Sequence, residues 1–366
     1  MLRGVAALCV VYFHLGELFW KDNTFVAKPL YLHPITLTSK PLFIYLTAWL
    51  GHNYIELGDF GVGLFFLISG FVIPFSLTKV GPVKFLVRRC FRIYPTYIVA
   101  MTFTLLVLAF NSRINQIPFT LTLSDYLANA ALLFDVFPHP RIGGVNWTLV
   151  IEMRFYLICA LICCFSNLRR VWPLLLCALL LCLSCQFVTR APDLLANVGL
   201  LSFATVVNDH APYLIFMLIG VCFHNLFETC WSVWLFTLMV GLLLVLFYLS
   251  ASTISYHQWV LRLTRSYTLA LVVFGLFYCY RNSLKPHPVL DFFAEISFPL
   301  YLIHSHPGVS LLTYLYNLHS FSLLNVLETL LVIIPLSYLL HVYVEVPSNR
   351  FGHSLTQKWS RSPIRS

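Results

Sequence analysis

Apolar segments close to 20 residues long recur along most of this chain of 366 residues. Wound as a helix, such a segment is long enough to cross the ~30 Å hydrocarbon core of a bilayer. Hydrophobic residues make up 59% of the chain and charged residues only 10%, against about 25% charged in an average soluble domain. The alternation typical of barrel strands is absent. The sequence therefore predicts an all-α, polytopic integral membrane protein.

We expect about ten transmembrane helices, and an even number places both termini on one side of the membrane. Basic residues are more frequent in the segments on that side, which predicts that both termini are cytoplasmic. The expected organisation is a membrane domain, residues 1–346, followed by a polar, basic cytoplasmic tail, residues 347–366. The expected helices are 3–20, 59–78, 92–110, 147–166, 171–188, 211–227, 231–250, 266–281, 293–316 and 322–344.

The formal net charge of +9 does not indicate nucleic-acid binding. The basic residues lie mostly between apolar segments, where they orient helices, whereas nucleic-acid binding needs a basic patch on a water-exposed face. The eleven cysteines fall almost entirely inside apolar segments and are expected to be small buried hydrophobes. Cys182 and Cys185 form a CxxC with no partner motif, so we expect no metal site.

Arg3 and His14 are the most informative pair in the chain. They lie eleven residues apart on the first apolar segment, so a helix brings them to within roughly 20° of one face, about 16 Å apart along its axis. Arg3 alone would be a membrane-edge anchor, and His14 alone a buried histidine bonded to a carbonyl. Ionisable residues inside a membrane mark functional sites, and imidazole can take a proton from a hydroxyl. We therefore favour a catalytic His14.

Three arginines follow the second apolar segment: Arg88, Arg89 and Arg92. Their i,i+3 and i,i+4 spacings gather the guanidinium groups on one side of a helix. Guanidinium forks suit phosphate groups. The alternative is a charge cluster that only fixes the orientation of the next helix. Because all three are arginine and none is lysine, we favour phosphate binding.

Glu152 lies within the segment that begins at Trp147. A carboxylate inside a membrane must be paired or protonated. Arg154 is only two residues away and points elsewhere on a helix. Glu152 is therefore a candidate partner for His14 from another helix, and the alternative is a structural ion pair. Trp147 suits the membrane interface and is also a candidate cavity-lining residue.

Three further residues are candidates for lining a polar cavity. Ser69 lies in a stretch rich in small residues, where we favour a role in helix packing over one in lining the cavity. Tyr301 and His304 follow Pro299, which should kink its helix and free backbone carbonyls. His304 either lines the same cavity as His14 or simply bonds one of those carbonyls.

Taken together, these segments resemble integral-membrane acyltransferase family 3, the O-acetylase group of bacterial surface polysaccharide modification. The resemblance rests on Arg3 with His14, the 61–71 stretch, the 88–92 arginines, the segment 147–156 and the segment 297–304, which occur in the family's order. It implies about ten membrane helices and transfer of acyl groups, most often acetyl, from cytoplasmic acyl-CoA to sugar hydroxyls. It also implies essential roles for the residues that match its motifs: Arg3, His14, Arg88, Arg89 and Arg92, with Glu152 by its place.

We therefore expect a membrane O-acyltransferase in the bacterial inner membrane. Arg3 and the three arginines would bind the donor, acyl-CoA, and the acceptor would be a glycan or another hydroxyl compound. His14 would act as general base or carry the acyl group briefly, with Glu152 orienting it. The alternatives are a proton-coupled transporter or flippase of a glycan or lipid-linked substrate, and a structural membrane scaffold. The acceptor, the acyl group, any protein partner and the oligomeric state cannot be read from the sequence.

Overall fold

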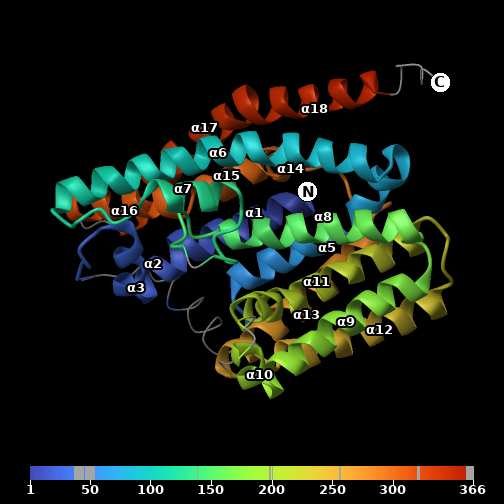
Figure 1. Cartoon of the computed structure of the whole chain (residues 1–366). Helices are drawn as coiled ribbons and strands as arrows, with labels where there is room; N and C mark the ends of the chain where they lie inside the picture. The colour runs from blue at the N-terminus through green and yellow to red at the C-terminus, as the bar shows by residue number, and fades with distance from the viewer. Residues whose placement is uncertain are drawn as a thin grey trace.

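The computed structural model describes residues 1–36, 45, 54–137, 139–197, 199, 201–254, 257–319 and 322–359. These residues form helices joined by turns and loops, with no strand among them. Within the described ranges, nine helices are long and apolar enough to cross a membrane. Figure 1 shows them as a bundle whose long members run roughly in one direction. The prediction of an all-α, polytopic membrane protein is confirmed.

The helices carry the labels of Figure 1. They are α1 (Leu2–Tyr12), α2 (Phe19–Lys21), α3 (Asn23–Ala27), α5 (Leu57–Val80), α6 (Pro82–Asn115), α7 (Leu123–Ala130), α8 (Asn146–Phe165), α9 (Val171–Arg190), α10 (Pro192–Asn197), α11 (Leu201–Phe227), α12 (Val233–Ala251), α13 (His257–Cys279), α14 (Pro288–Glu295), α15 (Ser297–Ile303), α16 (His306–Leu318), α17 (Ser322–Leu340) and α18 (Val346–Lys358). The short segments Phe13–Leu18 and His341–Glu345 are π-helical and join α1 to α2 and α17 to α18.

The expected helix 293–316 is divided into three pieces, α14, α15 and α16. Ile296 separates the first two, and a turn at His304 and Ser305 separates the last two. Pro299 and Pro307 occupy the first turns of α15 and α16, where the missing proline N–H costs no helical hydrogen bond. The three pieces follow one another across the molecule (Figure 1), so this segment runs along the bundle as a broken helix.

Glycines allow the central helices to approach closely. A Cβ atom built at Gly4 would lie 2.1 Å from the carbonyl oxygen of Leu290 in α14, and one at Gly61 would lie 2.7 Å from that of Ala6. Helix α1 is therefore held directly against α14 on one side and α5 on another. Close backbone approach through small residues is the usual way that membrane helices associate. This packing buries the face of α1 that carries the candidate site.

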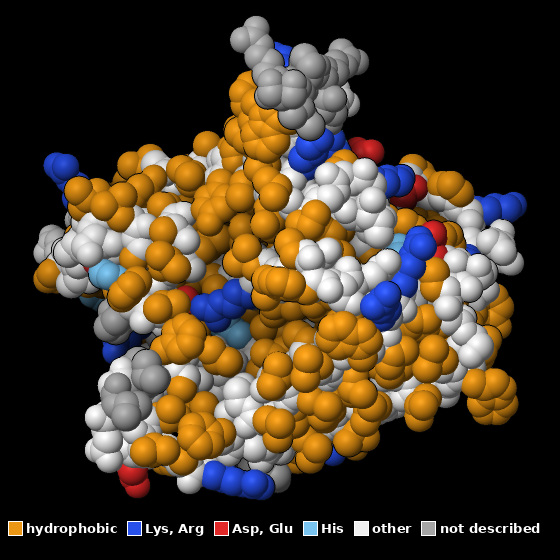
Figure 2. Space-filling view, turned by 45° about the vertical axis from the view of Figure 1, so that its right-hand side comes forward, with side chains coloured by type: hydrophobic (Ala, Val, Ile, Leu, Met, Phe, Trp, Pro, Cys, Tyr) orange, Lys and Arg blue, Asp and Glu red, His pale blue; other side chains and the backbone are white. Residues whose placement is uncertain are grey.

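The surface is apolar where lipid would contact it. Hydrophobic side chains cover most of the face in Figure 2, with comparatively few Lys, Arg, Asp and Glu among them. Large exposed apolar residues include Leu106, Phe165 and Leu331, with 63%, 81% and 73% of their surface exposed. A water-soluble monomer rarely exposes contiguous apolar patches of this kind. The exposed surface therefore agrees with a multi-pass membrane protein.

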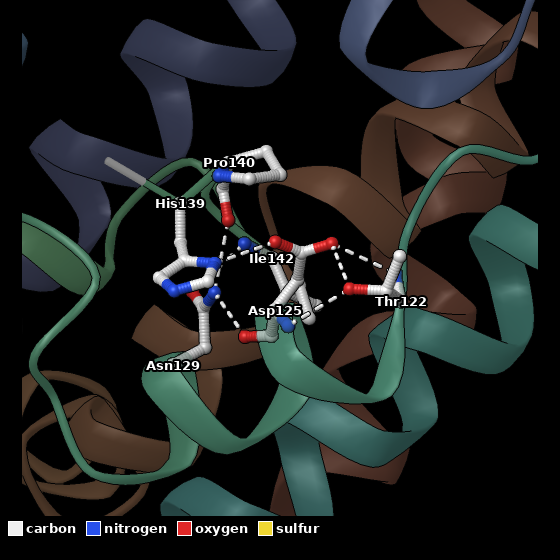
Figure 3. Close-up of polar contacts among 6 residues, drawn as sticks. All are labelled: Thr122, Asp125, Asn129, His139, Pro140 and Ile142. Carbon is white, nitrogen blue, oxygen red and sulfur yellow. Dashed lines mark hydrogen bonds and ion pairs between the residues drawn. The ribbon is translucent and has the colours of Figure 1, made fainter. Parts of the chain in front are cut away.

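A hydrogen-bond network fixes the loop between α7 and α8 (Figure 3). At the start of α7, Asp125 Oδ2 accepts a hydrogen bond from the Thr122 N–H, and Thr122 Oγ1 accepts one from the Asp125 N–H. The other carboxylate oxygen, Oδ1, lies 2.7 Å from His139 Nδ1. Asn129 donates to the Pro140 carbonyl and accepts from the Ile142 N–H, each at 2.9 Å. The hydrogen bonds from Thr122 and His139 lower the pKa of Asp125 below its ordinary value. The network sets the path of the chain into Gly143 and Gly144.

Candidate active site

The three arginines near the start of α6 line one cavity of about 420 Å³, together with Ser76 and His353. Arg89 donates to Ser76 Oγ at 3.1 Å, and Arg88 donates to Thr356 Oγ1 at 2.7 Å. No acidic side chain is among the described residues that line this cavity. The helix therefore gathers Arg88, Arg89 and Arg92 as their spacing predicts, in surroundings suited to phosphate.

Aromatic rings hold the middle arginine of this cluster in place. The guanidinium of Arg89 lies 5.1 Å from the ring centroid of Phe85 and 5.2 Å from that of Tyr156. Stacking on aromatic faces suits the planar guanidinium and leaves its edges available for anions. Tyr156, which lies in α8, also donates a hydrogen bond to Glu152. It therefore connects the arginine cluster to the next cavity.

Arg3 lines a second cavity of about 470 Å³, together with Ser69, Glu152, Ser297 and Tyr301. Ser69 Oγ donates to Glu152 Oε1 at 3.2 Å. Arg3 lies close enough to Glu152 to interact with its charge. Two of the candidate cavity-lining residues, Ser69 and Tyr301, thus meet the catalytic candidate Glu152 around Arg3. The cavity combines one cation and one carboxylate with hydroxyl and apolar side chains.

Trp147, another candidate cavity-lining residue, lies elsewhere. Its ring centroid is 5.3 Å from that of Tyr213 in α11, and it is not among the residues that line the Arg3 cavity. Its neighbour Thr148 takes that place and donates a hydrogen bond to the Tyr301 hydroxyl at 2.9 Å. Trp147 therefore packs α8 against α11, next to the cavity.

His14 lies at the start of the π-helical segment after α1, and His304 lies in the turn between α15 and α16. The two side chains are side by side. His14 Nδ1 is 3.0 Å from the Val10 carbonyl oxygen and 3.1 Å from His304 Nε2. His304 Nδ1 is 2.9 Å from the Leu300 carbonyl oxygen. A carbonyl oxygen only accepts, so each Nδ1 carries a proton. His14 Nδ1–H is then shared between Val10 and His304, and His14 Nε2 keeps a free lone pair.

His14 lines a third and larger cavity of about 1800 Å³. Ser305, His306, Gly143 and Gly144 line it as well. Its rim includes Lys28, Tyr31 and Arg141, and no acidic side chain is among the described residues that line it. Arg3 and His14 therefore share one helix but belong to two different cavities. Tyr301 of the Arg3 cavity contacts His304, with ring centroids 5.8 Å apart.

The partners of His14 differ from those considered in the sequence. The side chain within hydrogen-bond distance of His14 is His304, whereas Glu152 accepts from Ser69 and Tyr156. Sequence reasoning also gave no role to His306, which lies in the His14 cavity. The signal available was its position two residues after His304, in a segment whose proline and histidines already indicated a polar break. No pattern in the sequence placed that segment beside His14.

A chain of contacts from Tyr301 through His304 to His14 joins the Arg3 cavity to the larger cavity, within a bundle of membrane helices. The chain belongs to the acyltransferase domain family, whose model matches residues 1–342. A curated relative, nodulation protein 10 of Rhizobium leguminosarum bv. viciae, is 31% identical over 113 residues. The match covers 26% of this chain and 31% of that protein. No solved structure is significantly similar to this chain.

Proposed function

We propose that this protein transfers an acyl group, which we take to be acetyl, from cytoplasmic acyl-CoA to a hydroxyl of a surface or secreted glycan. The bacterial inner membrane is the proposed location, with both termini cytoplasmic. One observation supports this most directly: His14 borders a large cavity on the α7 side, while Arg3 on the same helix borders a cavity next to the arginine cluster. Donor and acceptor would approach His14 from opposite ends.

The donor would enter from the arginine cluster. Arg88, Arg89 and Arg92 would bind the phosphates of acyl-CoA through charge-assisted hydrogen bonds. Arg3, which lies within range of the Arg92 charge, would extend this positive surface toward the Arg3 cavity. The narrow pantetheine arm would then pass through the cavity beside Glu152, toward His304 and His14. Glu152 would balance the charge of Arg3 along this path.

His14 would act as general base. Its Nε2 lone pair would take the proton of the acceptor hydroxyl as the hydroxyl oxygen attacks the thioester carbonyl carbon. The carbon–sulfur bond then breaks, and the CoA thiolate leaves with the proton from the imidazolium. His304 accepts from His14 Nδ1–H and would orient the ring, so it is a positioning residue. Transfer in one step needs no covalent acyl-enzyme.

The test compares His14→Ala with the wild type in cells that make the native glycan. Mass spectrometry of surface glycans should find the mass of one acyl group in wild-type cells and none in the variant. The variant should still insert, because the change removes one side chain from a helix held by many other contacts. Full acylation in His14→Ala cells, with the variant in the membrane, would disprove the proposed mechanism.

A further inference from the structure

We infer that His306 is a second catalytic residue of this site. Its Nε2–H would donate a hydrogen bond to the thioester carbonyl oxygen as that oxygen becomes negatively charged. This inference rests on the proposed acyl transfer and adds the group that stabilises its transition state. Stabilising the developing oxyanion is usually the largest single contribution to acyl-transfer catalysis.

The hydrogen bond from Gly144 decides which ring nitrogen of His306 carries the proton. The Gly144 backbone N–H donates to His306 Nδ1 at 3.0 Å. A backbone N–H can only donate, so Nδ1 must present its lone pair to it. The proton of the neutral ring is therefore on Nε2. His306 is a hydrogen-bond donor at Nε2, the opposite of His14, whose Nε2 is an acceptor.

The two imidazoles share one cavity. His14 and His306 both line the 1800 Å³ cavity and lie close enough to interact electrostatically. They come from the π-helical segment after α1 and from the start of α16, two segments almost 300 residues apart in sequence. A base and a donor placed on one cavity wall are the two groups that attack on a carbonyl requires. The carbonyl carbon would lie between them.

The loop at Gly144 is built to hold His306. A Cβ atom added at Gly144 would lie 2.6 Å from Ser305 Oγ and 3.0 Å from His306 Cε1. Only glycine lets the backbone N–H approach the ring this closely. The hydrogen bonds of Asn129 to Pro140 and Ile142 fix the chain just before this loop. The tautomer of His306 is thus set by rigid backbone, as a preorganised donor requires.

The reaction step balances without another reactant. The acceptor hydroxyl oxygen bonds to the thioester carbon, and its proton passes to His14 Nε2. The carbonyl π electrons move to oxygen, which accepts a hydrogen bond from His306 Nε2–H. The oxyanion then re-forms the carbonyl, the carbon–sulfur bond breaks, and the thiolate takes the proton from His14. His306 keeps its own proton throughout.

Two substitutions separate a catalytic donor from a structural bond. Asn at position 306 can keep an acceptor for the Gly144 N–H near the Nδ1 position but has no donor near Nε2. Gln can place an amide donor near Nε2. We expect His306→Asn to lower kcat about 10²- to 10³-fold with an unchanged KM for acetyl-CoA, and His306→Gln to retain more activity. A purely structural role predicts the reverse order.

The activity readout is CoA released from acetyl-CoA by inverted membrane vesicles from cells that make the native glycan. A second readout is the carbonyl stretch of acetyl-CoA labelled with ¹³C at the carbonyl, measured on the purified protein. Hydrogen bonding from His306 should lower this frequency in the wild type and in His306→Gln, but not in His306→Asn. A thermal unfolding transition checks that each variant is folded.

The outcomes distinguish this inference from the proposed function. The wild type could acylate, His14→Ala could fail to, and His306→Asn could match the wild type in both readouts. That result refutes the role of His306 and leaves the proposed function standing. If neither the wild type nor His14→Ala releases CoA in the presence of the glycan, the proposed function fails and this inference fails with it. Loss of kcat with loss of the carbonyl shift in His306→Asn supports both.

Discussion

At the scale of single residues, hydrogen-bond partners determine what each histidine can do. The Val10 and Leu300 carbonyls fix a proton on Nδ1 of His14 and His304, while the Gly144 N–H removes it from Nδ1 of His306. In the proposed reaction, three side chains of the same type would therefore have different roles: base, positioning residue and donor. The roles follow from backbone partners that are local in space, so they hold without any charge on the rings.

Substitution of His304 tests its positioning role. His304→Phe removes the acceptor for His14 Nδ1–H, so we expect kcat to fall about fivefold, the equivalent of one hydrogen bond of about 1 kcal/mol, with KM for acetyl-CoA unchanged. His304→Gln offers an amide oxygen as acceptor and should recover part of kcat. The measurement is CoA release from membrane vesicles. Equal kcat in the wild type and His304→Phe would exclude the role.

Substitution of Arg92 tests donor binding. Arg92 lines the arginine cavity, and a hydrogen bond from a charged group contributes about 1.5–3 kcal/mol. Arg92→Gln should therefore raise KM for acetyl-CoA about 10- to 100-fold and leave kcat close to the wild-type value. Arg113→Gln, an exposed arginine at the other end of α6, is the matched control and should change neither. Equal effects of the two variants would argue against a phosphate site at Arg92.

At the scale of elements, glycine contacts set how closely the helices pack. Gly70 of α5 and Gly220 of α11 face each other: a Cβ at Gly70 would lie 2.0 Å from the Met217 carbonyl oxygen. Backbone atoms cannot move aside as the end of a side chain can. This crossing holds α5, which carries Ser69, in its place beside the Arg3 cavity. The small residues of the 61–71 stretch thus have the packing role expected of them.

Gly70→Ala should therefore destabilise the protein by about 1–3 kcal/mol, the usual cost of overpacking. Gly241→Ala is the matched control, because a Cβ at Gly241 in α12 would meet nothing within 4 Å. Alanine there should be neutral or slightly stabilising, since glycine lowers helix propensity. Thermal unfolding in detergent compares the two. Equal unfolding temperatures would show that the crossing is looser than the structure indicates.

The loop after α7 has a pH-dependent anchor. The folded-state pKa of Asp125 is lowered by Thr122 and His139, so its ionised form stabilises the fold. The stabilisation by the ionised carboxylate is complete at pH values above the unfolded-state pKa of about 3.9. It decreases as the pH falls below that value and is lost once the pH is below the lower, folded-state pKa. Asp125→Asn should cost about 1 kcal/mol at pH 7, and the difference from the wild type should vanish at low pH. Unfolding temperatures measured from neutral to acidic pH check this. A difference independent of pH would contradict it.

At the scale of the whole molecule, the bundle places three cavities in order along its length. The arginine cavity is lined from the end of α5, the start of α6 and α18, the Arg3 cavity by residues that include Arg3 near the start of α1, and the His14 cavity from α3 and the loop between α7 and α8. Figure 1 shows α2, α3 and α7 beyond the C-terminal end of α1. A donor and an acceptor on opposite sides of a membrane could then meet at His14 without either crossing completely. The proposed orientation puts the arginine end in the cytoplasm.

Cysteine labelling tests this orientation. Phe75 lies near the end of α5 that borders the arginine cavity, and its ring centroid is 5.7 Å from that of Phe227 at the end of α11. Cys230 follows Phe227 closely in sequence and is exposed, so it lies at the arginine end. Exposed Ser124 lies in α7, at the opposite end. With Cys230 as the only cysteine, a membrane-impermeant maleimide should label inverted vesicles and not intact spheroplasts. With Ser124→Cys as the only cysteine, the pattern should be reversed. The same sidedness for both would contradict the topology.

The sequence by itself determined the class of protein and the relations that helix spacing sets within one helix. The gathering of Arg88, Arg89 and Arg92 around one cavity follows from helix periodicity, which depends only on spacing. The resemblance to an acyltransferase family is likewise confirmed, because it rests on the order of motifs along the chain.

Only the tertiary structure decided which groups meet between helices. His304 lies against His14, 290 residues away in sequence, and Glu152 lies with Arg3 and Ser69 instead. Gly144 fixes the donor nitrogen of His306 from a loop 162 residues away. Periodicity defines a face but not its partner. Which segment packs against that face depends on close contacts at glycines such as Gly4, Gly61 and Gly144. No local sequence pattern predicts which segments make these contacts.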